Sequence, residues 1–392
     1  MIVPGALRYI LLAAMAMPWQ SVAQAQPITT IAPFAILLDF DTHTVLMEKD
    51  ADGLMAPAST AKLMTAELVF NEIAAGRLKL ADEFTVSENA WRTGGSLAHG
   101  SSMFAELHSR ISIENLIRGL VIQSGNDAAI ALAEGLAGSE GAFATRMNKR
   151  AGELGMTHST FTNPWGRGDP EQRVSARDMA LLADHIIRTY PEFYKYFAEK
   201  DFTWNKIKQP NRNPLLTMDI GADGLKTGDI KESGFALVGS AVQNGQRLIL
   251  VINGLKTAKD RAEEGRKLLQ WGFRAFEAKT LFNADDVIGT AQLFGGAEGS
   301  VPLVADGPVK VLLPRGGTER LTASILYTGP IAAPVQQGAQ IARLRVMRGA
   351  VQALDVPLKA AQAVPAGSLQ RRAWDGAWEL MTGLFRNSFA KK

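Results

Sequence analysis

The sequence contains no cysteine. This absence excludes disulfide scaffolds, thiolate nucleophiles and metal sites built from cysteine. Histidine is also scarce, and its five positions show no spacing typical of metal ligands; they are residues 43, 99, 108, 158 and 185. We therefore expect no metal and no cofactor.

The sequence also lacks an excess of charge of one sign. Its 42 basic residues nearly balance its 39 acidic residues, and no long basic stripe is present. Nucleic acid is therefore excluded as the main partner. With 392 residues, of which 46% are hydrophobic, the chain is long enough for more than one domain and for a sizeable core.

Residues 1–25 have the organisation of a secretory signal peptide. Arg8 supplies the positive charge, residues 9–17 form an apolar core, and Ala23 and Ala25 form a small-x-small cleavage site. The apolar core is shorter than the roughly 20 residues of a membrane-spanning helix. We expect cleavage after Ala25, with an uncleaved anchor as the alternative. Either form leaves the cytoplasm.

Residues 57–65 carry the first candidate catalytic pair. Pro57 is compatible with a helix start, and an apolar helical pattern continues to Gly76. Ser59 and Lys62 are three residues apart, so they share one helix face at about 5–6 Å. A hydroxyl beside an amine is a nucleophile beside a potential base, provided that the pKa of the amine is lowered. The pair alone is weak evidence, because Ser388 and Lys391 have the same spacing.

Two further motifs strengthen this interpretation. Ser124-Gly125-Asn126 lies between two helical patterns, and Lys226-Thr227-Gly228 opens a strand-like run. With Ser-Asp-Asn in the middle position, the same trio in the same order marks penicillin-binding proteins and class A β-lactamases. The order and local context of the three motifs make this a strong signal.

The segment that contains these motifs predicts an α+β domain over residues 26–282. Strand patterns occur near its beginning, at residues 35–48, and near its end, at residues 234–255, whereas its middle is helical. One antiparallel sheet built from both ends and covered by helices is the simplest assembly. We expect the glycine-rich loop at residues 87–102 to border the site.

The sequence pattern changes after residue 282. Short β patterns separated by glycine and proline predict a small all-β domain at residues 283–362. Residues 363–392 predict an amphipathic helix with Trp374 and Trp378 on its apolar face and arginine and lysine beside them. Such a helix suits the surface of the inner membrane. Packing of this helix against the β domain is the alternative.

The three motifs, with Ser124-Gly125-Asn126 in the middle, resemble those of the serine D-alanyl-D-alanine carboxypeptidases among the low-molecular-mass penicillin-binding proteins. The resemblance covers nearly the whole chain after the signal segment and includes residues 175–180 and 211–213. It implies a periplasmic enzyme on the outer face of the inner membrane. This enzyme would remove the terminal D-alanine from peptidoglycan stem peptides and would be acylated by β-lactam antibiotics.

Chemistry and resemblance together assign the catalytic roles. Ser59 attacks the carbonyl between the two D-alanines, and neutral Lys62 takes its proton. The Lys226 cation lowers the pKa of Lys62. Ser124 and Lys226 return a proton to the leaving amine, while Asn126 orients Lys62 and the substrate amide.

The third motif also predicts the substrate-binding residues. Residues 226–228 should form an edge strand beside which the peptide pairs, with Gly228 permitting close approach. Thr227 can bind the terminal carboxylate, and the resemblance implies the same role for Arg261. The backbone N–H groups of Ser59 and Asp229 are expected to bind the oxyanion. Asp229 is a departure, because well-known relatives carry histidine there. An acid at this position should weaken carboxylate binding unless a neighbour such as Arg261 neutralises it.

Three alternatives remain open at this stage. A β-lactamase needs a fast deacylation step, for which the loop at residues 163–173 offers Glu171 without a recognisable pattern. A D,D-endopeptidase usually lacks a second domain. A non-catalytic scaffold that binds the cell wall would not need all three motifs.

Overall fold

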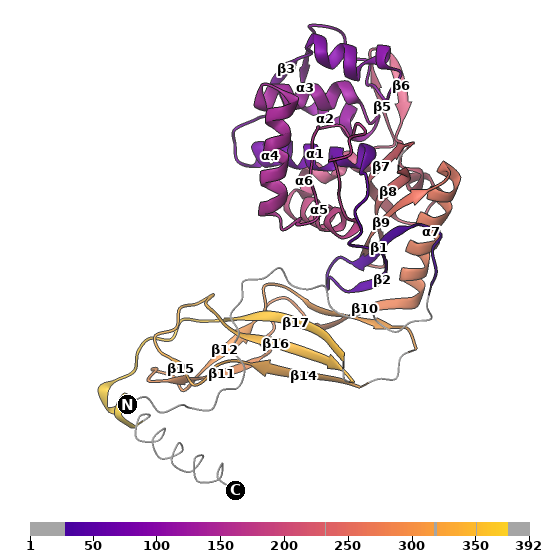
Figure 1. Cartoon of the computed structure of the whole chain (residues 1–392). Coiled ribbons are helices and arrows are strands. Elements are labelled where there is room, and N and C mark those ends of the chain that lie inside the picture. The colour runs from indigo at the N-terminus through magenta and orange to yellow at the C-terminus, as the bar shows by residue number, and fades with distance from the viewer. Residues whose placement is uncertain (1–27, 232, 317–319, 350, 375–392) are drawn as a thin grey trace.

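The computed structural model describes residues 28–374 except residues 232, 317–319 and 350. It contains a unit of helices and sheet followed by an extended β-rich unit (Figure 1). The predicted signal segment and most of the predicted C-terminal helix lie outside the described residues. No helix in the described part of the chain is both long and apolar enough to cross a membrane.

The first unit is built around a five-stranded antiparallel sheet with the strand order β2-β1-β9-β8-β7. Its strands come from both ends of the segment, as the sequence predicts: β1 (Phe34–Asp39), β2 (Val45–Lys49), β7 (Ala222–Ile230), β8 (Gly234–Gln243) and β9 (Gln246–Leu255). Strand β7, which carries the third motif, lies at the edge of the sheet. The predicted edge position is therefore confirmed.

Helices cover both faces of this sheet, so its central strands are buried on both sides. Helix α7 (Ala258–Ala275) packs on one face and forms one apolar core with it. The other face supports a larger core made with the remaining helices: α1 (Lys62–Ala74), α2 (Ile113–Val121), α3 (Asn126–Ala137), α4 (Glu140–Glu153), α5 (Ala176–Thr189) and α6 (Pro191–Tyr194).

Short elements connect the larger ones. The sequence patterns did not predict the two small antiparallel pairs, which are β3 (Glu83–Thr85) with β4 (Arg110–Ser112) and β5 (Asp201–Trp204) with β6 (Ile207–Pro210). The remaining short elements are the helical turns η1 (Ala58–Ala61), η2 (Ala90–Gly94), η3 (Ser96–Ala98), η4 (Lys195–Ala198) and η5 (Pro214–Thr217).

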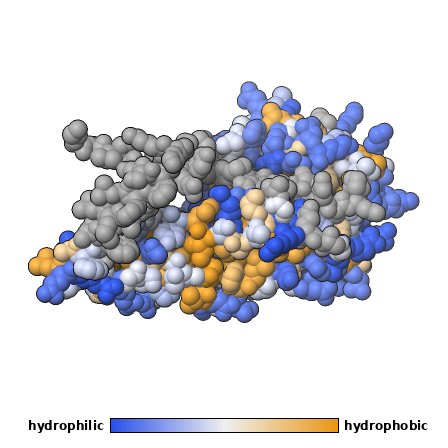
Figure 2. Space-filling model, turned by 90° about the horizontal axis from the view of Figure 1, so that it is seen from below, coloured by the Kyte–Doolittle hydropathy of each residue, from blue (hydrophilic) through white to orange (hydrophobic). Residues whose placement is uncertain are grey.

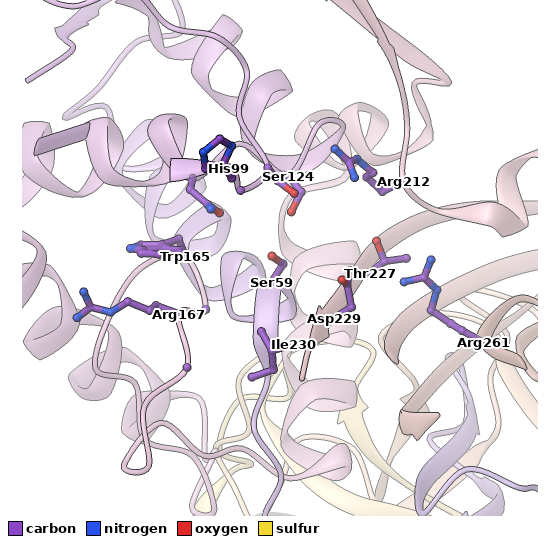
Figure 3. Close-up of a pocket in the computed structure, with 15 residues that line it drawn as sticks. Ser59, His99, Ser124, Trp165, Arg167, Arg212, Thr227, Asp229, Ile230 and Arg261 are labelled. Carbon is purple, nitrogen blue, oxygen red and sulfur yellow. The ribbon is translucent and has the colours of Figure 1, made fainter. Parts of the chain in front are cut away.

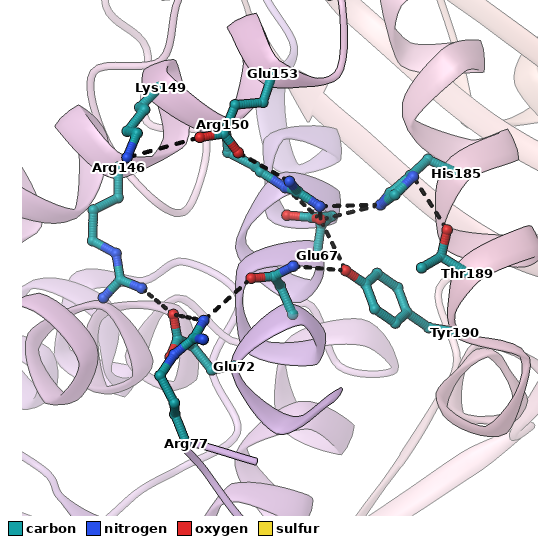
Figure 4. A network of polar contacts seen from close by, with 11 residues as sticks. Glu67, Glu72, Arg77, Arg146, Lys149, Arg150, Glu153, His185, Thr189 and Tyr190 are labelled. Atoms are coloured by element: carbon teal, nitrogen blue, oxygen red, sulfur yellow. Dashed lines mark hydrogen bonds and ion pairs between the residues drawn. The ribbon is translucent and has the colours of Figure 1, made fainter. Parts of the chain in front are cut away.

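A buried polar network fixes helix α1 (Figure 4). Glu67 on α1 is fully buried, and its carboxylate binds Arg150 on α4 at 2.8 Å and His185 on α5 at 3.3 Å. Tyr190 donates a further hydrogen bond to Glu67 at 3.2 Å. Burial opposes ionisation, but the bonds from His185 and Arg150 outweigh it and lower the pKa of Glu67. The network therefore ties the helix that carries Lys62 to two neighbouring helices.

The second unit contains a six-stranded sheet and a two-stranded sheet around a separate apolar core. The six-stranded sheet has the order β14-β16-β17-β12-β11-β15, with strands β11 (Gly289–Phe294), β12 (Ser300–Val304), β14 (Leu321–Leu326), β15 (Ile331–Ala332), β16 (Gln340–Arg348) and β17 (Val351–Ala360). The two-stranded sheet pairs β10 (Phe276–Phe282) with β13 (Val309–Pro314). The α+β fold class with an added β domain is therefore confirmed.

Strand β10 lies before the predicted boundary at residue 283, yet it pairs along its length with β13 of the β-rich unit. The two units also touch directly. Leu312 on β13 belongs to the core beneath α7, and Lys310 forms an ion pair with Asp41 of the first unit at 2.7 Å. The outer surface seen from below is mostly hydrophilic, with apolar patches between polar side chains (Figure 2).

The last described residues, 369–374, are helical. Leu369 and Trp374 are 81% and 73% exposed. Trp378 and the rest of the predicted apolar face lie outside the described residues.

Candidate active site

The first motif forms a tight turn that leads into a helix. Residues 58–61 form the turn η1, and α1 begins at Lys62, so Ser59 stands at the entrance of the helix. The amine of Lys62 lies 3.0 Å from the hydroxyl of Ser59. The structure thus places these two side chains together, as the three-residue spacing predicts.

Two further acceptors surround the Lys62 amine. It donates to Asn126 Oδ1 at 2.7 Å and to the backbone carbonyl of Trp165 at 2.7 Å. Both oxygens can only accept hydrogen bonds, so a neutral Lys62 amine donates its two hydrogens to them. Its lone pair then faces Ser59. This arrangement is compatible with the predicted role of neutral Lys62 as the acceptor of the Ser59 proton.

The electrostatic surroundings favour that neutral state. Lys62 is 1% exposed, and burial is the main reason why its pKa lies well below the ordinary value. The positive charges of Lys226 and Arg212 lower the pKa further, whereas Asp127 and Asp229 act in the opposite direction. Burial therefore favours the neutral amine of Lys62, and a neutral amine can act as a base.

The second and third motifs meet through a hydrogen bond between Lys226 and Ser124. Ser124 lies in the connection between α2 and α3 with a left-handed φ of 62°, and Asn126 is the first residue of α3. The Lys226 amine donates to Ser124 Oγ at 2.9 Å and to the carbonyl of Thr227 at 2.8 Å. Burial, together with two nearby arginines, lowers the pKa of Lys226 to about 7.

Ser59, Ser124 and Asn126 line one cavity of about 590 Å³ (Figure 3), and the two lysines lie buried behind them. Thr227, Asp229 and Arg261 stand on one side, and Trp165 and Arg167 stand on the other. Ser59 and Ser124 lie between the two sides. The predicted loop at residues 87–102 does border the cavity, through residues 99–101.

Close backbone packing sets the shape of this cavity. A Cβ added to Gly228 would lie 3.0 Å from the backbone nitrogen of Ser59, so strand β7 abuts the turn of the nucleophile. At Gly166, where φ is +86°, a Cβ would overlap the carbonyl oxygen of Ala58. Gly166 therefore cannot carry a side chain in this conformation, whereas a side chain at Gly228 would push its neighbours apart by a few tenths of an ångström.

Asn163 organises the loop that presents the Trp165 carbonyl. Its Oδ1 accepts hydrogen bonds from the backbone nitrogens of Gly166 and Arg167 at 2.8 and 2.9 Å. The indole of Trp165 donates to Glu140 Oε2 at 2.9 Å. The second acceptor for Lys62 therefore belongs to a braced loop.

Asp127 fixes the other border of the cavity. This buried carboxylate accepts from the Ser102 hydroxyl at 2.6 Å and from the backbone nitrogens of Met103 and Ala105 at 2.9 and 3.1 Å. The loop ahead of α2 is thereby attached to the start of α3, beside Asn126.

Arg261 and Asp229 both line the cavity, but no ion pair joins them among the described residues. Arg261 is 9% exposed, its guanidinium lies over the Phe235 ring at 5.5 Å, and its Nε has no hydrogen-bond partner. Burial lowers the pKa of Arg261 and the charge of Asp229 opposes this effect, so the two side chains are electrostatically coupled. Arg261 thus lines the cavity with a guanidinium that no ion pair neutralises among the described residues.

The structure gathers all nine predicted site residues around this cleft, and it adds three features that the sequence patterns did not assign. Arg212 lines the cavity and lowers the pKa of both lysines. The carbonyl of Trp165 is a backbone group, so no side-chain motif marks it. In the sequence, Gly166 was visible only as one of the glycines in the loop at residues 163–173.

An antiparallel sheet between helical layers, with a serine and two buried lysines in one cleft, defines a serine acyl-transfer enzyme. Comparison with known proteins identifies the family. The family described as "D-alanyl-D-alanine carboxypeptidase" matches residues 20–257, and the "Penicillin-binding protein 5, C-terminal domain" matches residues 276–366. The chain belongs to the D-alanyl-D-alanine carboxypeptidase family.

Individual relatives cover most of the chain. D-alanyl-D-alanine carboxypeptidase DacC of Escherichia coli is 40% identical over 343 residues, which are 87% of this chain and 86% of the relative. The crystal structure of penicillin-binding protein 5 from Haemophilus influenzae matches with a TM-score of 0.81 at 36% identity, covering 87% of this chain and all of that one. Penicillin-binding protein D2 of Listeria monocytogenes in its ampicillin-bound form matches at 28% identity and a TM-score of 0.55, covering 63% of this chain and all of that one.

Proposed function

We propose that Ser59 is the nucleophile with which this serine D-alanyl-D-alanine carboxypeptidase removes the terminal D-alanine from peptidoglycan stem peptides. The observation that carries the proposal is the position of the Lys62 amine, 3.0 Å from Ser59 Oγ, with its hydrogens directed to Asn126 and Trp165. Neutral Lys62 takes the hydroxyl proton while Ser59 Oγ bonds to the carbonyl carbon.

The leaving amine departs on the other side of the cleft. Lys226 and Ser124, 2.9 Å apart, form a path for the proton that the D-alanine nitrogen needs as its bond to the carbonyl carbon breaks. The acyl group then remains on Ser59 until water releases it. The backbone N–H groups of Ser59 and Asp229 stabilise the oxyanion.

Thr227 and Arg261 bind the terminal carboxylate of the substrate. Arg261 lines the cavity and forms no ion pair among the described residues, which supports this role. The Asp229 carboxylate repels the substrate carboxylate and so weakens its binding to Thr227 and Arg261. Gly228 lets the peptide backbone approach the edge of β7.

The cleft does not favour a β-lactamase. Glu171 lies on an exposed part of its loop, and Asp229 is the one carboxylate among the described residues that line the cavity. A rapid deacylation step needs a base that holds water near the acyl bond, and no glutamate takes that place here. We therefore expect β-lactams to form a long-lived acyl-enzyme. The match to a family of penicillin-binding proteins and to an ampicillin-bound relative supports this expectation.

We further propose a periplasmic location at the outer face of the inner membrane. The signal-like residues 1–25 direct export, and the amphipathic residues 363–392 bind the membrane surface. The catalytic domain then ends near residue 275, because β10 pairs with the β domain.

Release of free D-alanine from diacetyl-Lys-D-Ala-D-Ala tests the activity. Ser59→Ala should abolish both this release and covalent labelling by fluorescent penicillin. Ser388→Ala is the matched control, because Ser388 also stands three residues before a lysine. Penicillin labelling that survives Ser59→Ala would identify a different nucleophile.

A further inference from the structure

A second cavity lies beside the active-site cleft. It has a volume of about 860 Å³ and shares Gly168 and Ile230 with the first cavity. Its lining includes the apolar side chains of Phe34, Leu54 and Met55. Leu54 is 58% exposed, so the cavity offers apolar surface to a ligand.

In the proposed binding mode, the upstream part of the substrate peptide extends toward this second cavity. With the terminal carboxylate at Thr227 and the scissile carbonyl at the nitrogen of Asp229, the peptide runs antiparallel to β7. Each upstream residue advances about 3.4 Å along the strand. Ile230 follows Asp229 directly and belongs to both cavities. Residues upstream of the two D-alanines therefore pass from the first cavity into the second.

Among its described lining residues, the second cavity carries three cations and one carboxylate, so positive charge is in excess even though Asp169 interacts with Arg173. Its lining includes Arg173, Lys231 and Lys256, and none of these forms an ion pair among the described residues. The Arg173 guanidinium donates to two backbone carbonyls at 2.9 Å, so hydrogen bonds fix its place without neutralising it. Asp169 is the one carboxylate among the described lining residues, and it accepts from the backbone nitrogen of Glu171 at 2.8 Å.

We propose that this second cavity is an upstream substrate subsite that selects stem peptides with a free carboxylate. Arg173 and Lys256 attract the carboxylate, and Leu54 contacts the aliphatic part of the same side chain. This inference rests on the proposed function, because the direction of the peptide follows from the placement of its scissile carbonyl. It assigns specificity to residues outside the three catalytic motifs.

Matched peptide pairs test the subsite. Acetylated peptides ending in Lys(acetyl)-D-Ala-D-Ala carry either glutamate or glutamine at one of three upstream positions, and kcat/KM is measured with the full chain from released D-alanine. We expect glutamate to be preferred about threefold to tenfold at one position. The preference should shrink at high salt, because the cations are partly exposed.

Substitutions in the second cavity test which residues produce the preference for glutamate. Lys256→Gln should remove about half of the preference on a logarithmic scale, and Lys256→Glu should abolish or invert it. Arg173→Gln should also weaken it, and Arg173→Lys should restore it, which separates charge from loop stability. Lys79→Gln makes the same charge change at an exposed site that lines neither cavity, and it should leave the preference unchanged.

Two results would overturn the subsite: equal kcat/KM for every glutamate and glutamine pair, or a preference that survives both Lys256→Glu and Arg173→Gln. The minimal peptide diacetyl-Lys-D-Ala-D-Ala carries no side-chain carboxylate for the subsite, so the wild-type protein should cleave it whether or not the subsite exists. Failure of the wild-type protein to cleave the minimal peptide would instead refute the proposed function.

Discussion

Replacement of Lys226 by methionine should stabilise the protein at pH 6 while it destroys activity. Lys226 is 2% exposed, and its pKa is lowered from 10.5 to about 7. At about 1.4 kcal/mol for each pH unit, holding this group as a cation below pH 7 costs about 5 kcal/mol of folding free energy. Methionine has a similar length and no charge, so it removes this cost.

Part of that gain is offset by lost hydrogen bonds. The amine donates to Ser124 and to the carbonyl of Thr227. Each bond contributes about 1 kcal/mol net, so we expect Lys226→Met to be more stable by about 3 kcal/mol at pH 6. Activity is lost because the proton path to the leaving amine is gone.

The pH dependence supplies an independent check. Between pH 7 and pH 10.5 the unfolded chain binds more protons at this site than the folded chain does, so the stability of the wild-type protein rises with pH in that window. The advantage of methionine should therefore fall by about 1.4 kcal/mol per pH unit above pH 7 and vanish near pH 9.

Urea denaturation at pH 6 and pH 9, followed by tryptophan fluorescence, measures the stability difference between Lys226→Met and wild type and its change with pH. Four of the seven tryptophans belong to the catalytic unit, so most of the signal reports on that unit; they are Trp91, Trp165, Trp204 and Trp271. Lys79→Met, at an exposed lysine, should change stability by less than about 0.5 kcal/mol at either pH. A Lys226→Met protein that is less stable than wild type at pH 6, or whose difference does not change with pH, would refute this account of the site.

Three further substitutions test other parts of the structure. Asp229→Asn should raise kcat/KM for carboxylate-terminated peptides about threefold or more at low salt, and an effect that persists in about 1 M salt would contradict its electrostatic origin. Gly166→Ala should lower the melting temperature and slow acylation by penicillin, because the added methyl group overlaps the carbonyl of Ala58; unchanged acylation would show that this loop does not position Lys62. Glu67→Gln should cost about 3 kcal/mol in urea denaturation, because Arg150 loses a buried partner. A loss below about 1 kcal/mol would show that the network in Figure 4 contributes little.

The regular elements of the catalytic unit followed from local patterns in the sequence. Strand patterns at residues 35–48 and 234–255 predicted the two hairpins β1–β2 and β8–β9. The β3–β4 and β5–β6 pairs were missed, because short strands with partly exposed faces carry a weak periodic signal.

The sequence by itself determined which chemical groups are available: one hydroxyl placed beside an amine within a single helical turn, and two more motifs of defined type. Local geometry was enough for that, since residues three apart on a helix are neighbours. Only the tertiary structure decided that Lys62 is buried and faces the carbonyl of Trp165, because burial and backbone carbonyl positions depend on contacts between distant segments. The same long-range packing lowers the pKa values of both lysines, which is what the proposed role of Lys62 as the base for Ser59 requires.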